Sequence, residues 1–393
     1  MGLSFSLLTY TGFMITRLFN RCSFLAAATL LCSALGAQDL DTYIQGRMNR
    51  AHVPGLSACI VKDGSVVWAK GYGYADLSNG IPVDTDTAFL LASVSKTVTA
   101  TAVVQLADLG WIDLDDDISA WLPLNAQNPR NPGTPIRFRQ LLSHAAAIQD
   151  NWDVMDQYYV SGDSPVPLGT FLADYLIPGG ANYVQNSNWY AWAPGQGLSY
   201  SNIGMATAGY MVEAVTGSPF DAFCETTMFS RLGMNHTSWF LAGLQHATIA
   251  LPYEYRWLSG QYVTQGHYGF PDYPDGQLRS SVEDLAQFLI AHAGDGSVHG
   301  VRILSTASVA EMRRVQYPQF DPVQGLGFYH WHYQGEDRIG HDGGEVGAAT
   351  LMWYRPADGV GVIVLSNGSA VLPFEWAALV DVVNRLFVES EQY

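Results

Sequence analysis

Residues 91–109 read LASVSKTVTATAVVQLADL, and this run contains neither proline nor glycine. Such a run predicts a long helix, which Gly110 would end as a C-terminal cap because glycine adopts the left-handed conformation without strain. Apolar residues recur within the run at helical spacing: Val94, Val98, Ala102, Leu106 and Leu109. This spacing predicts that one buried stripe follows the helix.

The same run contains a serine and a lysine three residues apart. The chain has three lysines, and only Lys96 follows a serine at this interval, in Ser93-Val94-Ser95-Lys96. Positions i and i+3 share a helix face, so the Ser93 hydroxyl and the Lys96 amine can meet. A partly buried lysine can take the serine proton and so create a nucleophile, and a helix N-terminus favours a developing oxyanion. The alternative interpretation is a serine cap followed by an unrelated lysine.

The composition argues against several classes of function. The chain has 393 residues, 48% of them hydrophobic and 14% charged, and its formal net charge is −17. It is long enough for a large core in one or two domains. An acidic surface repels phosphate backbones, so we do not expect nucleic acid as a partner. The cysteines and histidines show no metal-ligand spacing, and we expect neither a metal nor another cofactor.

Residues 1–37 are typical of a secretory signal peptide. Arg17 and Arg21 precede an apolar run over residues 22–35, and small residues close the segment. The alternative is a membrane anchor, which the length disfavours because a spanning helix needs about 20 apolar residues. We therefore expect a secreted or periplasmic protein that is not inserted in a membrane after the signal is removed.

Two cysteines follow the predicted signal, Cys59 and Cys224. They would be able to pair in an oxidising compartment, where disulfides persist. The alternative for these two cysteines is a pair of buried thiols, which is the preferred interpretation.

Strand patterns stand at both ends of the chain that follows the signal. The N-terminal pair is a hairpin with Asp63-Gly64 at its turn, and a second pair stands near the C-terminus. The expected strands are residues 56–61, 66–75, 348–354 and 360–365, and the expected terminal helices are residues 39–51 and 374–388. We therefore predict an α/β fold, an antiparallel sheet built from both termini and flanked by helices, with an inserted mostly helical region.

The expected boundaries follow from this pattern. The sheet region would comprise residues 38–112 and 300–393, and the mostly helical region residues 113–299. Together they would form one catalytic domain over about residues 45–390.

A second group that serine–lysine chemistry needs is a proton shuttle to the leaving group. Tyr200 and Asn202 alternate about Ser201 in a turn-rich loop, so both side chains can point into one cleft. A phenol close to a lysine ammonium has a stabilised phenolate and can act as base or acid. Tyr200 is therefore a candidate for this role.

A third segment is His341-Asp342-Gly343-Gly344, which leads into the strand pair over residues 348–365. Glycines at this point would let a substrate backbone approach a sheet edge. The N–H group of Gly344 would then serve an oxyanion together with that of Ser93.

The order Ser-x-x-Lys, Tyr-x-Asn, His-x-Gly resembles the serine β-lactamase-related family. This family includes class C β-lactamases, D-alanyl-D-alanine carboxypeptidases, D-aminopeptidases and family VIII esterases. Other segments that resemble it are residues 54–56, 71–76, 89–96, 106–110, 141–144 and 194–202. The resemblance implies a fold like that of serine β-lactamases and penicillin-binding proteins.

The resemblance also implies a role for each candidate residue. Ser93 would be the acylated nucleophile, Lys96 its proton partner, and Tyr200 the general base and acid. The substrate-binding residues would be Asn202, which also orients the lysine, and His341, Gly343 and Gly344, which line the cleft.

The third motif departs from that of class C β-lactamases, where it resembles Lys-Thr-Gly. The histidine here is mostly neutral at neutral pH, which weakens recognition of a substrate carboxylate. We therefore expect a secreted serine hydrolase that forms an acyl-enzyme on Ser93 and cleaves esters or small amides and peptides, esters above all. The alternatives are a β-lactamase, a D-alanyl-D-alanine carboxypeptidase or D-aminopeptidase, and a non-turnover penicillin-binding or sensor-like module.

Overall fold

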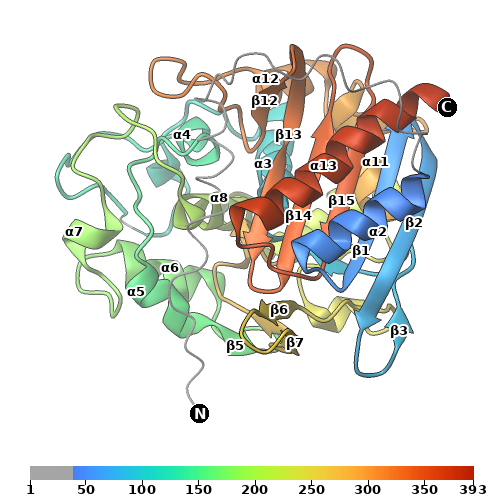
Figure 1. Cartoon of the computed structure of the whole chain (residues 1–393). Helices are drawn as coiled ribbons and strands as arrows, with labels where there is room; N and C mark the ends of the chain where they lie inside the picture. Colours follow the sequence, from blue (N-terminus) through green and yellow to red (C-terminus); the bar gives the residue numbers. More distant parts are fainter. Residues whose placement is uncertain (1–38, 125) are drawn as a thin grey trace.

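A seven-stranded sheet forms the centre of the computed structural model, which describes residues 39–124 and 126–393 (Figure 1). The predicted signal peptide lies outside the described residues. The strand order is β12-β13-β14-β15-β1-β2-β3, and every neighbouring pair is antiparallel. The strands are β1 (Gly55–Lys62), β2 (Ser65–Asp76), β3 (Ile81–Pro82), β12 (Tyr329–Tyr333), β13 (Glu336–Glu345), β14 (Ala348–Tyr354) and β15 (Gly361–Ser366).

The sheet is built from both ends of the chain, which confirms the predicted fold class. The N-terminal strand β1 pairs directly with the C-terminal strand β15, and Cys59 lies opposite Ile363. Successive side chains of a strand point to opposite faces. Ala58 and Ile60 accordingly belong to the core on one face, while Cys59 and Val61 belong to the core on the other. Both faces of the sheet are therefore buried.

The two terminal helices cover one of these faces. Helix α2 (Leu40–Ala51) and helix α13 (Pro373–Glu389) pack side by side on this face, as Figure 1 shows. Both helices lie where the sequence predicted them. Their apolar sides and one face of the central strands make a single buried cluster.

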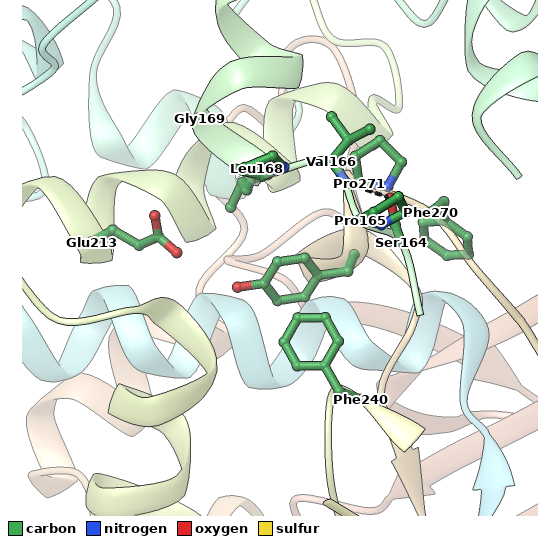
Figure 2. Close-up of a pocket in the computed structure, with 11 residues that line it drawn as sticks. Ser164, Pro165, Val166, Leu168, Gly169, Glu213, Phe240, Phe270 and Pro271 are labelled. Atoms are coloured by element: carbon green, nitrogen blue, oxygen red, sulfur yellow. Dashed lines mark hydrogen bonds between the residues drawn. The ribbon is translucent and has the colours of Figure 1, made fainter. Parts of the chain in front are cut away.

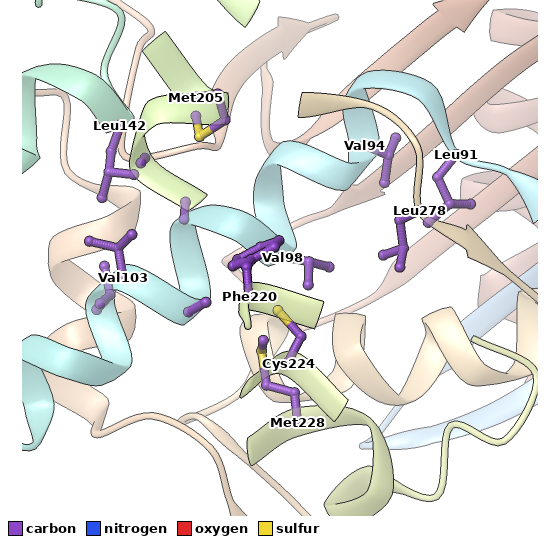
Figure 3. Close-up of a cluster of buried hydrophobic side chains, with 14 of the residues drawn as sticks. Leu91, Val94, Val98, Val103, Leu142, Met205, Phe220, Cys224, Met228 and Leu278 are labelled. Carbon is purple, nitrogen blue, oxygen red and sulfur yellow. The ribbon is translucent and has the colours of Figure 1, made fainter. Parts of the chain in front are cut away.

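The other face of the sheet meets the helices that carry the site. Helix α11 (Val282–Ala293) packs on β1 and β15, and helix α3 (Ser95–Asp108) packs on helix α8 (Asn202–Thr216). Figure 3 shows the apolar side chains that surround α3 in this second core. The predicted boundaries at residues 112/113 and 299/300 stay a prediction.

Helix α3 is buried all round and not along one stripe. Every residue from Ser95 to Leu106 is buried, whereas Leu109 is 59% exposed. The prediction that Leu109 belongs to the buried stripe was therefore wrong, because neighbouring elements surround the helix over most of its length and end before its last turn. Gly110 adopts a positive φ of 71°, as expected of a C-terminal cap.

The two cysteines of the described region are free and buried. This confirms the preferred interpretation of Cys59 and Cys224 as buried thiols. Burial raises the pKa of both thiols, because a thiolate is poorly solvated in an apolar core.

The remaining helices and strands are short. The helices are α4 (Phe138–Leu142), α5 (Trp152–Met155), α6 (Leu168–Leu176), α7 (Gln185–Asn188), α9 (Phe220–Cys224), α10 (Ser230–Leu232) and α12 (Thr306–Arg313). The small strand pairs are β4 (Phe89–Leu90) with β9 (Arg279–Ser280), β5 (Val160–Ser161) with β8 (Tyr268–Gly269), β6 (Tyr253–Arg256) with β7 (Gln261–Thr264), and β10 (Ser297–Val298) with β11 (Val301–Arg302). In the described part of the chain, no helix is both long and apolar enough to cross a membrane.

Candidate active site

Ser93 lies on a single 3₁₀ turn, η1 (Ala92–Val94), directly before helix α3. The turn is held on two sides. The Leu91 amide donates a hydrogen bond to the Leu278 carbonyl at 2.8 Å, and the Thr350 hydroxyl donates to the Leu91 carbonyl at 2.7 Å. Ala92 adopts a φ of 48°, a conformation that costs energy in a residue with a side chain. The surrounding contacts thus fix the serine in one position.

Lys96 lies on the first turn of α3 and reaches back to the serine. Its Nζ atom donates hydrogen bonds to Ser93 Oγ at 3.0 Å and to the Asp275 carbonyl at 2.6 Å. The side chain is only 1% exposed. Burial lowers the pKa of Lys96, although the negative charges of Asp275 and Asp150 oppose this shift. A buried ammonium with a lowered pKa gives up its proton more readily than one in water.

Tyr200 approaches the same serine oxygen from another element. Its hydroxyl donates to Ser93 Oγ at 2.7 Å, and Lys96 Nζ lies 4.9 Å from the centre of its ring. Burial raises the pKa of Tyr200 well above its usual range, and the hydrogen bond with Ser93 opposes this only partly. Desolvation of the ring therefore works against the stabilised phenolate that the sequence predicted.

Asp150 and His144 position the loop that carries Tyr200. The Asp150 carboxylate accepts hydrogen bonds from the amides of Asn202 and Ile203 at 2.8 and 3.1 Å and from the Ser201 hydroxyl at 3.0 Å. It thus neutralises the free N–H groups at the start of α8. His144 Nδ1 accepts from the Ser201 amide at 3.2 Å, and its ring centre lies 4.4 Å from that of Tyr200.

Sequence reasoning missed the contribution of Asp150 and treated His144 only as part of a segment that resembles the family. Neither residue belongs to a local pattern with the loop that it supports, because they lie 52 and 57 residues away from their partners. Asn202, which the sequence predicted as a substrate-binding residue, begins α8 with a half-buried side chain.

The third motif lies on strand β13, next to the serine turn. The ring of His341 is buried, with its centre 6.3 Å from the Tyr200 ring and 5.2 Å from the Tyr329 ring. A Cβ atom on Gly343 would lie 2.8 Å from the Ser93 backbone nitrogen, so glycine is required for this close approach. Gly344 is exposed, and a Cβ atom there would meet nothing within 4 Å. Packing therefore requires a glycine at position 343 but not at position 344.

The structure thus brings Ser93, Lys96, Tyr200 and the His341 strand together. The sequence has two further His-x-Gly triplets, which begin at His267 and His292. His292 is buried against the Thr101 hydroxyl at 3.0 Å, and burial lowers its pKa to about 3. His267 follows the β6–β7 hairpin, and burial lowers its pKa to about 4.

A cavity of about 230 Å³ lies between α6, the end of α8 and the turn η6 (Tyr273–Asp275), as Figure 2 shows. Prolines and aromatic side chains form much of its lining. Its one carboxylate, on Glu213, accepts a hydrogen bond from the Phe220 amide at 3.1 Å and so satisfies the start of α9. None of the residues around Ser93 lines this cavity, so it is not part of the site.

Across the described residues, no group of three acidic, histidine or cysteine side chains is placed to hold a metal ion.

Comparison with known proteins places this chain in a family. A family model described as Beta-lactamase matches residues 40–383. The chain therefore belongs to the β-lactamase family, which generally contains serine hydrolases.

Individual relatives are similar at moderate identity. The chain is 27% identical over 252 residues to Protein flp of Staphylococcus aureus strain MRSA252, a match that covers 64% of this chain and 48% of that protein. The chain thus spans about half the length of the curated relatives that it matches first. It is 27% identical over 346 residues to penicillin-binding protein 4 of Amycolatopsis lactamdurans, with 82% and 83% covered.

Among solved structures, the octameric penicillin-binding protein homologue from Pyrococcus abyssi is similar. Its TM-score is 0.72 at 27% identity, and the match covers 88% of this chain and 77% of that chain. This likeness agrees with the predicted fold.

Proposed function

We propose that this protein is a serine hydrolase that forms an acyl-enzyme on Ser93. One observation carries the proposal. Two proton-bearing groups, the Lys96 amine and the Tyr200 hydroxyl, both lie within hydrogen-bond distance of Ser93 Oγ. A serine becomes a strong nucleophile only when a neighbouring base accepts its proton, and two groups here are placed to exchange protons with it.

The opposite pKa shifts divide the roles between these two groups. Burial lowers the pKa of Lys96 and raises that of Tyr200. Lys96 is therefore the group that more readily stands without a proton and can accept one, and Tyr200 is the group that keeps its proton and can pass it on. This assignment differs from the one that the family resemblance implies, in which Tyr200 is both base and acid.

Acylation would proceed in two proton transfers. Lys96 Nζ takes the Ser93 hydroxyl proton while Oγ forms a bond to the substrate carbonyl carbon. Tyr200 then donates its proton to the leaving-group oxygen or nitrogen as the bond from the carbonyl carbon to it breaks, and the Lys96 ammonium returns a proton to Tyr200. In deacylation, water gives a proton to neutral Lys96 as its oxygen bonds to the ester carbonyl carbon, and the Lys96 ammonium returns that proton to Ser93 Oγ as the bond from Oγ to this carbon breaks.

The oxyanion of each tetrahedral intermediate needs hydrogen-bond donors. The backbone N–H groups of Ser93 and Gly344 are the proposed pair. Support comes from Gly343, whose missing side chain lets β13 approach the Ser93 nitrogen closely. Gly344, the next residue, is exposed.

Esters are the proposed main substrates, as the sequence of the third motif favours. His341 stands where a lysine would present a permanent positive charge to a substrate carboxylate. The second candidate is hydrolysis of small amides, D-peptides or β-lactams. The likeness to penicillin-binding protein 4 favours it. A penicillin-binding or sensor-like protein that acylates without turnover is the third.

Stopped-flow kinetics separates these candidates. Wild-type protein is mixed with p-nitrophenyl butyrate and, in parallel, with a chromogenic cephalosporin. A serine esterase gives a burst of p-nitrophenol followed by steady turnover. A single burst without turnover identifies the non-turnover module, and faster turnover of the cephalosporin identifies a β-lactamase. No reaction that depends on Ser93 with either compound would contradict the proposed function.

We also propose that the protein is secreted or periplasmic. The support is the basic and apolar sequence of residues 1–37. Sequencing the N-terminus of protein recovered from outside the cytoplasm tests this, and a mature chain that still begins with the basic segment would contradict it.

A further inference from the structure

We propose that His144 determines how well this protein cleaves substrates whose leaving group must be protonated, such as alkyl esters and amides, because its neutral imidazole holds Tyr200 in place for the proton transfer. This inference rests on the proposed function of Ser93 and Tyr200, and it adds the residue that sets the leaving-group preference. His144 acts through Tyr200 and is therefore a positioning residue.

His144 binds the residues on both sides of Tyr200. The Ser199 amide donates a hydrogen bond to the His144 carbonyl at 3.0 Å, and the Ser201 amide donates to His144 Nδ1 at 3.2 Å. The imidazole and phenol rings also contact each other, with centres 4.4 Å apart and planes at 40°. One residue that is 2% exposed thus holds the backbone before and after Tyr200 and packs on its ring.

The hydrogen bond to Nδ1 identifies the nitrogen of His144 that carries the proton. A backbone N–H group can only donate, so Nδ1 is the unprotonated acceptor and the neutral ring has its proton on Nε2. The loop therefore needs an acceptor at this place in the side chain. A residue without one leaves the buried Ser201 amide without this partner, which is costly.

Backbone conformation alone does not explain a histidine here. His144 has a φ of 60°, and histidine and asparagine adopt positive φ more readily than most residues. However, Ala147 in the same loop also has a φ of 60°, so the loop accepts this conformation in a residue with a plain methyl side chain. The imidazole is therefore better explained by its contacts with Tyr200 and Ser201.

The position of the Tyr200 hydroxyl should matter unequally for different leaving groups. The hydroxyl lies 2.7 Å from Ser93 Oγ, and a general acid must stand within hydrogen-bond reach of the atom that it protonates. A displacement of about 1 Å can cost about a hundredfold in rate. An alkoxide or an amide nitrogen needs a proton to leave, whereas p-nitrophenolate is a stable anion and leaves without one. A displaced phenol should therefore slow alkyl esters and amides and spare p-nitrophenyl esters.

Two esters that form the same butyryl-enzyme, methyl butyrate and p-nitrophenyl butyrate, test this inference. The readout is the ratio of their kcat/KM values, methyl over p-nitrophenyl. His144→Phe keeps a ring and His144→Gln places its amide near the position of Nε2, but both lack an acceptor at Nδ1, and the ratio should fall about tenfold or more. His144→Asn, whose Oδ1 stands at the position of Nδ1, should keep most of the ratio. In a Tyr200→Phe background, His144→Phe should not lower it further.

A second buried histidine supplies the matched control. His292 is also 2% exposed and contacts the Thr101 hydroxyl, so His292→Asn should keep the wild-type ratio. Urea unfolding of each variant identifies those that are folded.

Four outcomes would overturn the inference. His144→Phe and His144→Gln slow both esters equally, His144→Asn lowers the ratio as far as Tyr200→Phe does, the ratio falls further in the Tyr200→Phe background, or the wild type hydrolyses p-nitrophenyl butyrate alone. Hydrolysis that depends on Ser93 would in each case still support the proposed function. If neither ester is hydrolysed in a reaction that depends on Ser93, the proposed ester hydrolysis itself is contradicted, and the inference with it.

Discussion

The hydroxyl of Tyr200 lies 2.7 Å from Ser93 Oγ, although the two residues are 107 positions apart in the sequence. Lys96, on helix α3, donates a hydrogen bond to the same oxygen at 3.0 Å. Because both groups exchange protons with one atom, we expect them to act as a unit. The double variant Lys96→Met/Tyr200→Phe should be scarcely slower than either single variant. Steady-state kcat/KM of the four proteins gives the answer, and fully additive losses would show separate proton pathways.

The pH dependence follows from the shifted pKa of Lys96. Because burial lowers this pKa, kcat/KM should rise with pH through an apparent pKa below the ordinary lysine value of about 10.4. The free energy of unfolding changes with pH in the same direction as the rate. In the window between the lowered folded pKa and the ordinary value, the unfolded chain binds more protons, so the free energy of unfolding increases with pH. A rate profile for a neutral ester from pH 5 to 10 tests this, and a rate that falls between pH 7 and 9 would be contrary to it.

Asp150 should matter for stability and for the position of Tyr200. Asp150→Ala removes the acceptor of three hydrogen bonds at the start of α8, and we expect a loss of about 1–3 kcal/mol in the free energy of unfolding. Activity should fall further than stability explains. Asp153→Ala, three residues on and exposed, is the matched control and should change stability by less than about 0.5 kcal/mol. Urea unfolding of both variants measures the difference, and equal effects would refute the assignment.

His341 should set the preference between neutral and anionic substrates. A charge-assisted contact to a carboxylate is worth roughly 1.5–3 kcal/mol, so we expect His341→Lys to improve kcat/KM for a cephalosporin about ten- to a hundredfold relative to p-nitrophenyl butyrate. His341→Gln, which is polar and neutral, separates the effect of charge from that of shape. If the wild type already hydrolyses the cephalosporin faster than the ester, His341 does not limit recognition of the anion.

Much of the fold could be predicted because its signals are local. The Asp63-Gly64 turn follows from its turn residues, β1 from a short run of mostly apolar residues before that turn, and α13 from helical periodicity. The surroundings of α3 could not be predicted in this way. Its burial depends on which elements pack around it, and no periodicity within the run distinguishes a stripe from a helix enclosed on all sides.

The geometry of the site could be predicted in part. The spacing of three residues predicted that Lys96 meets Ser93, and the structure confirms the contact, although Ser93 lies on the turn η1 and Lys96 on the first turn of α3. The pKa direction of Tyr200 could not be predicted, because desolvation depends on the whole fold. The Asp275 carbonyl that holds Lys96 is a backbone group 179 residues away, and a backbone acceptor leaves no signal in residue types.

Covalent labelling at Ser93 tests the central claim most directly. Wild type and Ser93→Ala are treated with a fluorophosphonate probe or with a penicillin, and intact-mass spectrometry records the adduct. The account predicts one adduct per wild-type chain and none on Ser93→Ala, together with a loss of about 10⁴-fold or more in the rate of ester hydrolysis. Equal labelling of both proteins would contradict it.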